Sequence, residues 1–298
     1  MTSIKNIIND LENSDIDYKF IGNPDVIITN IKSLESLDSN SIAFCRTNIL
    51  IDYKEKFKPN NVVIINFTVK DEELPHGNYI KVENPDLAFC IIAKRFLDKK
   101  GYFKHPTVII TGNNEISENV YIGAYSCIEN SVIDNDVTIE ENCVIKNSFI
   151  KKGTHIFPGV SLGSSGLGSK KDRFGQYHDF PHFSRVIIEN NVVIQDGTVI
   201  NRGTLNDTIV GKNSRIGPMV KIGHGTIIGQ SCFISQGATI AGSVKIGNHC
   251  KIWGNVSIRD TIRIGNNAVI GMGAVVVKNI PEGETWVGNP AKRITKTT

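Results

Sequence analysis

The feature that most constrains this fold is a stretch, residues 210–276, in which an aliphatic residue recurs at every sixth position without a break. A glycine often follows the aliphatic residue, and a small or β-branched residue stands two positions before it. Six residues advance a helix by about 1.7 turns, so in a helix these side chains would spiral around the axis. A fixed six-residue period is instead typical of a parallel β-helix, in which each repeat is one short strand and a corner. The repeated residues are Val210, Ile216, Ile222, Ile228, Ile234, Ile240, Ile246, Ile252, Ile258, Ile264, Ile270 and Val276.

One coil of such a chain cannot bury its own apolar face, and stacking of neighbouring coils produces a continuous core. We therefore expect a mainly β protein, a left-handed parallel β-helix of hexapeptide repeats preceded by a small α/β domain. The aliphatic side chains should point inward, and the residues on either side of them should form the outer faces.

The repeat divides the chain into three parts. Residues 1–105 lack it and predict a small α/β domain, with helices over Ile4–Leu11 and after Asn84-Pro85. In the second helix, an apolar face should include Leu87, Ile91, Ile92 and Phe96. Residues 106–280 predict the β-helix, and residues 281–298 a tail. Strands are expected at Val26–Ile28, Ile42–Cys45, Val62–Ile65 and Tyr79–Val82.

The period begins before the unbroken stretch and is interrupted twice. A long insertion, residues 163–185, is rich in glycine, serine and charge, and a short one follows at Asn201–Asp207. Insertions in a solenoid leave as loops on one face, which is often the binding face. About ten coils of three hexads are expected. The earlier repeat positions are Ile110, Ile116, Ile122, Ile128, Ile133, Ile139, Ile145, Ile156, Leu162, Ile188, Ile194 and Ile200.

Composition excludes several classes of protein. A formal net charge of +3 on 298 residues gives no nucleic-acid footprint. No apolar run reaches the roughly 18 residues of a membrane span, and the N-terminus lacks the apolar core of a signal peptide. The six cysteines have no CxxC spacing, and Cys143, Cys232 and Cys250 occupy small-residue positions of the repeat. We therefore expect reduced core thiols and a cytoplasmic protein.

His224 is the best candidate for a general base. It stands two places after Ile222 and between two glycines, so the repeat puts its imidazole outside the core. A solvated surface histidine is the alternative, and no carboxylate adjacent in sequence orients the ring. Gly242 lies three hexads further along, one full coil, where its N–H could meet an oxyanion. A simple corner glycine is the equal alternative.

His178 and His182, in the long insertion, are candidates to touch substrate across a subunit boundary, with ordinary polar loop residues as the alternative. A metal site is not expected, because the interval between His224 and His249 is not a whole coil and the two do not share a position on one face. The cysteine spacings do not match zinc sites either. Gly163–Gly168 is rich in glycine but lacks the Lys-Ser/Thr of a phosphate-binding loop.

The segments IGHGTIIG, IAGSVKIG and NRGTLNDT, with ITNIKSLESLDSNSIAF and VENPDLAFCIIAKRF before them, resemble the lipid A UDP-3-O-acylglucosamine N-acyltransferases. The resemblance covers nearly the whole chain. It implies a homotrimer with active sites between neighbouring β-helices, an N-terminal nucleotide-binding domain, His224 as catalytic base and Gly242 as oxyanion donor. Asn201, Arg202, His178 and His182 would then contact the nucleotide-sugar substrate.

The sequence departs from that family at three places. The usual Asp-Arg-Gly is Asn201-Arg202-Gly203, and of the uracil-stacking pattern there remain Phe44 with Asn48 and Tyr53 as rough substitutes. The family's helical C-terminal tail is replaced by Ile280–Ile294, which resembles the ending of coenzyme A-dependent sugar acetyltransferases. The donor-binding residues implied by this second resemblance are Gly242, Lys278, Asn289, Pro290, Lys292 and Arg293.

Together these features predict an N-acyltransferase that moves an acyl group from acyl-coenzyme A to the amine of a nucleotide-linked amino sugar, in cell-envelope or surface polysaccharide synthesis. Acyl-coenzyme A would be a co-substrate, with no permanently bound cofactor. One alternative is the lipid A step itself, with an acyl carrier protein as donor. Another is a non-catalytic trimeric scaffold that binds sugar nucleotides.

Overall fold

The computed structural model describes residues 1–46, 49–97 and 100–294. It divides into two compact units, Met1–Lys99 and Lys100–Thr298, which are treated separately below. None of the helices in the described ranges has the length and apolar character needed to cross a lipid bilayer.

The N-terminal unit is a five-stranded sheet with two helices. The sheet has the order β2-β7-β6-β5-β4, with β2 antiparallel to β7 and the other pairs parallel. The helices are α1 (Ile4–Glu12) and α2 (Pro85–Ala93), and the side chains of Ser3 and Asn84 accept hydrogen bonds at their N-termini. The strands are β1 (Thr2–Ser3), β2 (Tyr18–Ile21), β3 (Ile27–Ile28), β4 (Asn30–Ile31), β5 (Ser41–Phe44), β6 (Val62–Asn66) and β7 (Asn78–Val82), with 3₁₀ turns at Ile49–Lys56, Asp71–Glu73 and Lys94–Phe96.

The sheet separates two small cores. Alternate residues of β6 point to opposite faces, so Val62 and Ile64 pack with both helices while Val63 and Ile65 pack with Tyr79 on the other face. The predicted apolar face of α2 is partly wrong, because Leu87 is 49% exposed. Helix α2 begins at Pro85, and the spacing from that residue turns Ala88 rather than Leu87 into the core, while Ile92 is buried as predicted.

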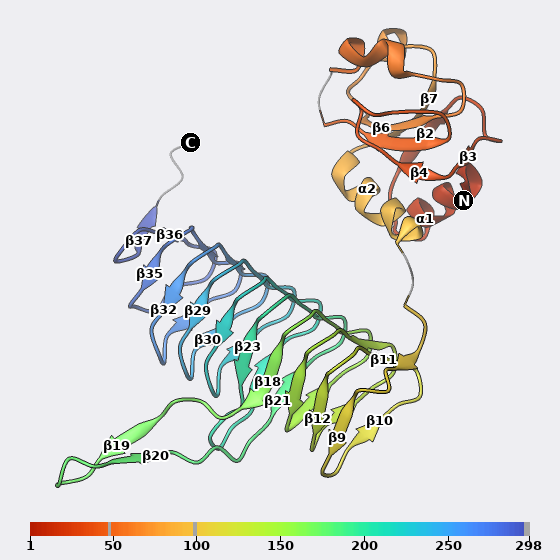
Figure 1. The fold of residues 1–298 in the computed structure, drawn as a ribbon. Coiled ribbons are helices and arrows are strands. Elements are labelled where there is room, and N and C mark those ends of the chain that lie inside the picture. The colour runs from red at the N-terminus through yellow and green to blue at the C-terminus, as the bar shows by residue number, and fades with distance from the viewer. Residues whose placement is uncertain (47–48, 98–99, 295–298) are drawn as a thin grey trace. The chain divides into compact units, whose positions relative to one another are not determined.

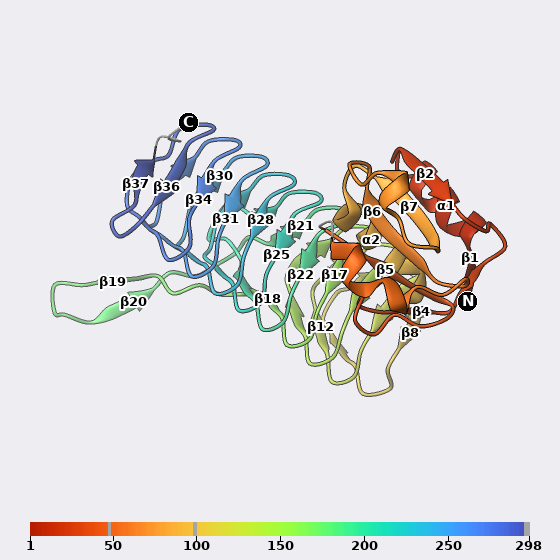
Figure 2. The same ribbon diagram turned by 90° about the horizontal axis from the view of Figure 1, so that it is seen from above.

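The second unit is a parallel β-solenoid with three faces (Figures 1 and 2). Face 1 contains β8 (Phe103–Lys104), β11 (Val120–Ile122), β14 (Val137–Ile139), β17 (His155–Ile156), β22 (Val193–Ile194), β25 (Arg215–Ile216), β28 (Phe233–Ile234), β31 (Lys251–Ile252), β34 (Val269–Ile270), β36 (Thr285–Val287) and the antiparallel β37 (Lys292–Ile294). Face 2 contains β9 (Ile109–Thr111), β12 (Cys127–Glu129), β15 (Val144–Lys146), β18 (Ser161–Ser164), β23 (Val199–Asn201), β26 (Lys221–Ile222), β29 (Thr239–Ile240), β32 (Ser257–Ile258) and β35 (Val275–Val276). Face 3 contains β10 (Glu115–Ile116), β13 (Val132–Ile133), β16 (Ser148–Ile150), β21 (Val186–Ile188), β24 (Thr208–Val210), β27 (Ile227–Ile228), β30 (Lys245–Ile246) and β33 (Arg263–Ile264).

The predicted inward register is confirmed throughout the unbroken stretch. All twelve repeated aliphatic side chains from Val210 to Val276 are at most 3% exposed, and they join one continuous core. From Val210 to Ile258, each pairs with its counterpart one coil on, as Ile222 does with Ile240 and Ile240 with Ile258. The mainly β solenoid with a preceding α/β unit is therefore as the period predicts.

The two ends of the solenoid differ from the expected limits. Strand β8 already pairs with β11, so the first rung lies before residue 106. At the other end, β36 pairs with β34 and β37 folds back on β36, so the sheet continues past residue 280. Ile110, expected inside, is 39% exposed because β9 is the edge strand of face 2 and no earlier coil covers it there.

Both insertions leave the solenoid at the same corner, the edge between faces 2 and 3. The long insertion follows β18 and the short one follows β23 in the next coil. Within the long insertion, β19 (Ser169–Lys171) and β20 (Tyr177–Asp179) form an antiparallel hairpin that projects from the coils (Figures 1 and 2). We call this edge the insertion corner.

Candidate active site

The insertion corner brings together most of the candidate residues. In each coil the second residue after the buried aliphatic of face 2 occupies this corner. Strand pairing along face 2 therefore stacks candidates that are far apart in sequence, one in each coil. The stacked corner residues are Arg202, His224, Gly242, Asp260 and Lys278; in the coil before them a register shift pairs Ser164 with Asn201.

His224 lies outside the core, as its position in the repeat predicts, and is partly buried. Its imidazole is held between two glycines. A Cβ built on Gly242 would lie 2.6 Å from Nε2 of His224, and one built on Gly166 would lie 3.0 Å from its Cδ2. Any side chain at either position would displace the ring, so both glycines fix the place of His224. The backbone N–H of Ser243 binds the carbonyl of His224 at 2.8 Å.

Two hollows flank His224. The smaller, of about 250 Å³, lies on the side of the long insertion and is bordered by Lys170, His182 and Thr204. The larger, of about 650 Å³, is bordered by Asp207, Ser243 and Lys245. His224 and Thr204 line both hollows, so the imidazole stands where two ligands in neighbouring hollows would meet.

The structure brings His182 to His224 within one chain, and the expected contact with substrate across a subunit boundary stays a prediction. The rings meet edge to face, with centroids 5.3 Å apart and planes at 72°. His182 is only 3% exposed, because the end of the insertion returns to the coils before β21. His178 has a different setting, on the exposed hairpin, where its Nε2 lies 3.0 Å from Oδ2 of Asp172. His178 borders neither hollow beside His224.

Asn201 and Arg202 tie the two insertions together. The side-chain amide of Asn201 donates to the carbonyls of Ser164 and Ser165, at 3.2 and 3.1 Å, and the backbone N–H of Arg202 donates to Ser164 at 3.0 Å. The amide donors expected to bind substrate are thus used within the protein. The Nε of Arg202 is buried and has no hydrogen-bond partner.

The residues predicted for the donor end lie further along the solenoid. Lys278 is exposed at the insertion corner, three coils beyond His224. Asn289 and Pro290 are exposed in the turn between β36 and β37, and Lys292 is exposed on β37. Arg293 forms an ion pair of 3.1 Å with Glu284, so part of its charge is neutralised.

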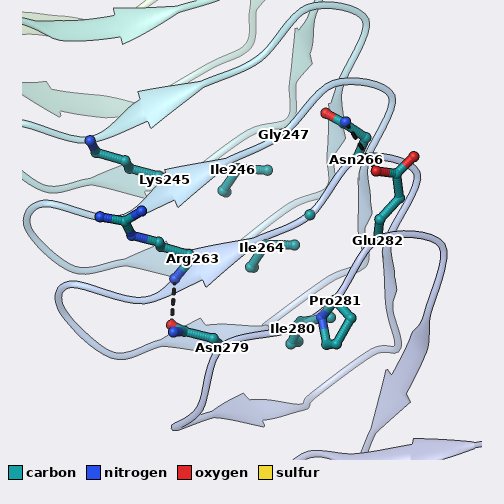
Figure 3. A pocket seen from close by; sticks show the side chains of 11 residues that line it. Lys245, Ile246, Gly247, Arg263, Ile264, Asn266, Asn279, Ile280, Pro281 and Glu282 are labelled. Atoms are coloured by element: carbon teal, nitrogen blue, oxygen red, sulfur yellow. Dashed lines mark hydrogen bonds between the residues drawn. The ribbon is translucent and has the colours of Figure 1, made fainter.

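Two cations that sequence reasoning missed lie nearer to His224. Lys245 on β30 and Arg263 on β33 are paired neighbours on face 3, and their side chains extend to the same side of the solenoid (Figure 3). They border a hollow of about 510 Å³, and Lys245 also borders the larger hollow at His224. No ion pair of either residue occurs in the described part of the chain. The sequence did contain a signal for this pair. The two residues are one full coil apart, and each stands one place before a repeated isoleucine.

The N-terminal unit has a pocket of its own, of about 400 Å³, lined by Phe44, Arg46 and Tyr53 among others. Phe44 stacks on Phe89 with centroids 4.4 Å apart, and the Arg46 guanidinium lies 5.4 Å from the Phe44 ring centroid. An aromatic floor with a cation and hydroxyls is suited to a planar polar ring. Asn48, the other expected stacking partner, lies outside the described residues.

Comparison with known families finds two family models that match parts of the solenoid. A family model described as bacterial transferase hexapeptide matches residues 207–242 and 243–278, which hold His224, Gly242 and Lys278. A second, described as GlmU-like C-terminal hexapeptide, matches residues 108–178. The chain is similar to the bacterial hexapeptide-repeat transferases, and its relatives and structural neighbours indicate an enzyme of the acyltransferase class.

Individual relatives are similar to this chain over a little under two thirds of its length. The UDP-3-O-acylglucosamine N-acyltransferase of Hydrogenovibrio crunogenus is 27% identical over 211 residues, which cover 63% of this chain and 59% of that relative's length. The crystal structure of the UDP-N-acetylglucosamine O-acyltransferase from Moraxella catarrhalis RH4 superposes with a TM-score of 0.59 at 25% identity, covering 64% of this chain and 73% of that one. The Francisella novicida UDP-N-acetylglucosamine acyltransferase gives 0.59 at 26% identity, covering 64% and 69%.

In the described residues no group of three or more His, Cys, Asp or Glu side chains is placed to hold a metal ion. The polar groups around His224 are instead hydrogen-bonding side chains, glycine backbone and cations. Such a set is suited to taking a proton and stabilising an anion.

Proposed function

We propose that this protein transfers an acyl group from a thioester to the amine of a nucleotide-linked glucosamine. One observation carries the proposal: His224, between Gly166 and Gly242, stands at the junction of two hollows, one extending towards the cations Lys245 and Arg263. A donor and an acceptor could approach the imidazole from opposite sides. The similarity to the N-acyltransferase of Hydrogenovibrio crunogenus supports an amine as the acceptor.

The chemistry would proceed in one sequence at the insertion corner. The amine nitrogen attacks the thioester carbonyl, and His224 takes the proton that the amine loses. The carbonyl oxygen becomes an oxyanion, which the N–H of Gly242 would stabilise. Collapse of the intermediate breaks the carbon–sulfur bond, and the thiolate leaves and takes a proton. Positioning supplies much of the rate, because a free amine already attacks thioesters.

The named relatives favour the lipid A alternative over the coenzyme A reading. We therefore propose UDP-3-O-acylglucosamine as acceptor and a 3-hydroxyacyl carrier protein as first-choice donor. Acyl-coenzyme A remains the competing donor, and the exposed Lys278 and Lys292 support it. Both donors present the acyl group on a phosphopantetheine thiol, so a single groove can serve either chemistry.

We further propose a homotrimer in which a neighbouring solenoid closes the groove beside His224. The protein would act in the cytoplasm, because Cys143, Cys232 and Cys250 are buried thiols of the solenoid core, as expected in a reducing compartment. Light scattering of the purified protein should give three times the mass of the chain. A monomer with full activity would contradict the shared groove.

The decisive experiment incubates the purified protein with UDP-3-O-acylglucosamine and each donor, and detects the N-acylated product by mass spectrometry. His224→Ala should lower kcat by about 10²- to 10⁴-fold, the range for a positioned base. A matched control is His249→Asn, because His249 is an exposed corner histidine at φ 58° and Asn267 takes the same position one coil on. Nucleotide binding without transfer from either donor would support the scaffold reading instead.

A further inference from the structure

His182 has an unusual hydrogen-bonding state. Both of its ring nitrogens are buried and have no hydrogen-bond partner, and the same is true of the Nε of Arg202. Among the described residues, only five buried side-chain atoms have no hydrogen-bond partner, and three of them are these nitrogens. Buried polar groups are normally paired, and leaving one unpaired is costly. A cluster of unpaired atoms next to the candidate base indicates a place that a ligand completes.

The ring of His182 borders the smaller hollow beside His224. Gly166 packs against the other side of the pair, because a Cβ there would lie 3.1 Å from Nε2 of His182 and 3.0 Å from Cδ2 of His224. Ser169, Lys170 and Thr204 line the same hollow, with the Phe180 ring as an apolar wall. The hollow therefore combines one apolar surface with several hydrogen-bonding groups, as sites for hydroxylated ligands do.

The charge state of His182 narrows the choice of ligand group. Burial lowers the pKa of His182 and the nearby His224 lowers it further, and these two effects outweigh the opposing effect of the Phe180 backbone. The ring is then neutral at neutral pH, with one nitrogen as donor and the other as acceptor. A hydroxyl matches this pair of capacities, because it donates one hydrogen bond and accepts others. A phosphodiester, or the diphosphate of a sugar nucleotide, has no proton to give to the acceptor nitrogen.

We propose that His182 is a specificity-determining residue that hydrogen-bonds a hydroxyl group of a substrate held in the smaller hollow. The inference rests on the acyl transfer proposed above. Two sources can supply the hydroxyl: the sugar ring of the acceptor, or the acyl chain of a 3-hydroxyacyl donor. Both would place the hydroxyl close to the reacting atoms at His224.

The test measures kcat/KM with two matched pairs of substrates. One pair of donors differs in the hydroxyl on the acyl chain, and one pair of acceptors differs in a free hydroxyl on the sugar ring. The wild-type protein should prefer the hydroxylated member of one pair by about 10- to 100-fold, because the unpaired nitrogen rejects the analogue that lacks it. The pair that shows the preference identifies the source.

His182→Phe keeps an aromatic ring against His224 and removes both nitrogens, so it should abolish the preference. His182→Gln retains a donor and an acceptor and should restore part of it, while His249→Asn should leave it intact. An unchanged preference in His182→Phe would overturn the inference, as would equal rates for both members of each pair in the wild type. Absence of all transfer by the wild type would refute the proposed function itself.

A second measurement covers the case in which His182→Phe does not fold. The ring resonances of His182 in the wild-type protein are followed by nuclear magnetic resonance during titration with each member of the preferred pair. The hydroxylated ligand should shift these resonances and the analogue should shift them little. Equal shifts with both members would overturn the role of His182.

Discussion

The regular coils and the two insertions of the solenoid follow different rules. In the coils from Val210 to Val276, each residue's side is set by its place in a coil of three hexads, and all twelve repeated aliphatics are inside. In the insertions no period operates, and contacts such as His182 on His224 depend on where the chain returns. The coils therefore supply the frame together with His224 and Gly242, while the insertions supply walls of the candidate site and further polar groups such as His182.

The largest expected effect is a loss of stability when a charge is placed inside the coils. Ile240→Asp puts a charge into a side-chain position that is 1% exposed, and an uncompensated buried charge costs about 3–5 kcal/mol. We expect loss of the cooperative thermal transition in circular dichroism. Thr239→Asp, at the exposed neighbouring position, is the control and should melt as the wild type. Equal melting of both variants would show that the coil register does not govern stability.

Gly242→Ala tests the point where a regular coil meets the site. Its methyl group would lie 2.6 Å from Nε2 of His224, so the ring must shift. A displacement of about 1 Å near the reacting atoms can lower kcat roughly 100-fold. The melting temperature should change little, because the methyl projects outside the core. Gly101→Ala, where nothing lies within 4 Å, is the matched control. Full activity in Gly242→Ala would refute the proposed seating of His224.

Asn201→Ala tests whether the insertions are held by a few local bonds. Loss of the two hydrogen bonds to the Ser164 and Ser165 carbonyls should cost about 1–2 kcal/mol. The effect should be local, with faster amide hydrogen exchange in residues 163–185 and a several-fold lower kcat/KM. Exchange in the coils should be unchanged, as in Asn190→Ala, a control at an exposed corner. A uniform rise in exchange over the solenoid would contradict this division.

Two carboxylates give the smallest effect. Burial alone would raise the pKa of Glu140 in the coils, but hydrogen bonds from His155 and Lys100 outweigh it and lower that pKa. The stability that Glu140 contributes is thus present above its unfolded pKa, near 4.5, and is lost as pH falls through the lower folded value. Glu140→Gln should flatten the decline of the melting temperature in acid.

Asp172 is the counterpart on the hairpin. The hydrogen bond from His178 lowers the pKa of Asp172, but both groups lie on an insertion that projects from the coils. Asp172→Asn should therefore leave the acid dependence of global melting unchanged. If Asp172→Asn flattened the decline of the melting temperature in acid as much as Glu140→Gln does, the hairpin and the coils would unfold as one unit.

The same contrast explains what the sequence could predict. The six-residue period predicts the solenoid, its interior and the outward side of His224, because every coil repeats one local geometry. The proximity of Gly242 follows from its spacing of one whole coil alone. The period fails at Ile110, which lies on an edge strand. In the N-terminal unit, the exposure of Leu87 depends on where helix α2 begins and on a sheet formed by distant segments.

The site was less predictable where it depends on long-range return of the chain. No pattern in residues 163–185 indicates that His182 contacts His224. Nor does the sequence indicate that the side-chain amide of Asn201 donates hydrogen bonds to the carbonyls of Ser164 and Ser165. Lys245 and Arg263 were overlooked although their spacing is regular. Lys245 borders the hollow at His224, and both cations border the next hollow on face 3. Hollows arise from side chains of several coils together, which a local pattern does not reveal.

Stacking of Gly242, Asp260 and Lys278 at equal intervals has a consequence for substrate length. Neighbouring strands of a sheet are about 4.8 Å apart. Duplicating one coil between Gly242 and Lys278 would move the distal lysine away by one such step, with the cross-section and the imidazole's seating unaltered. Reach along this edge is therefore adjustable only in whole rungs of the solenoid.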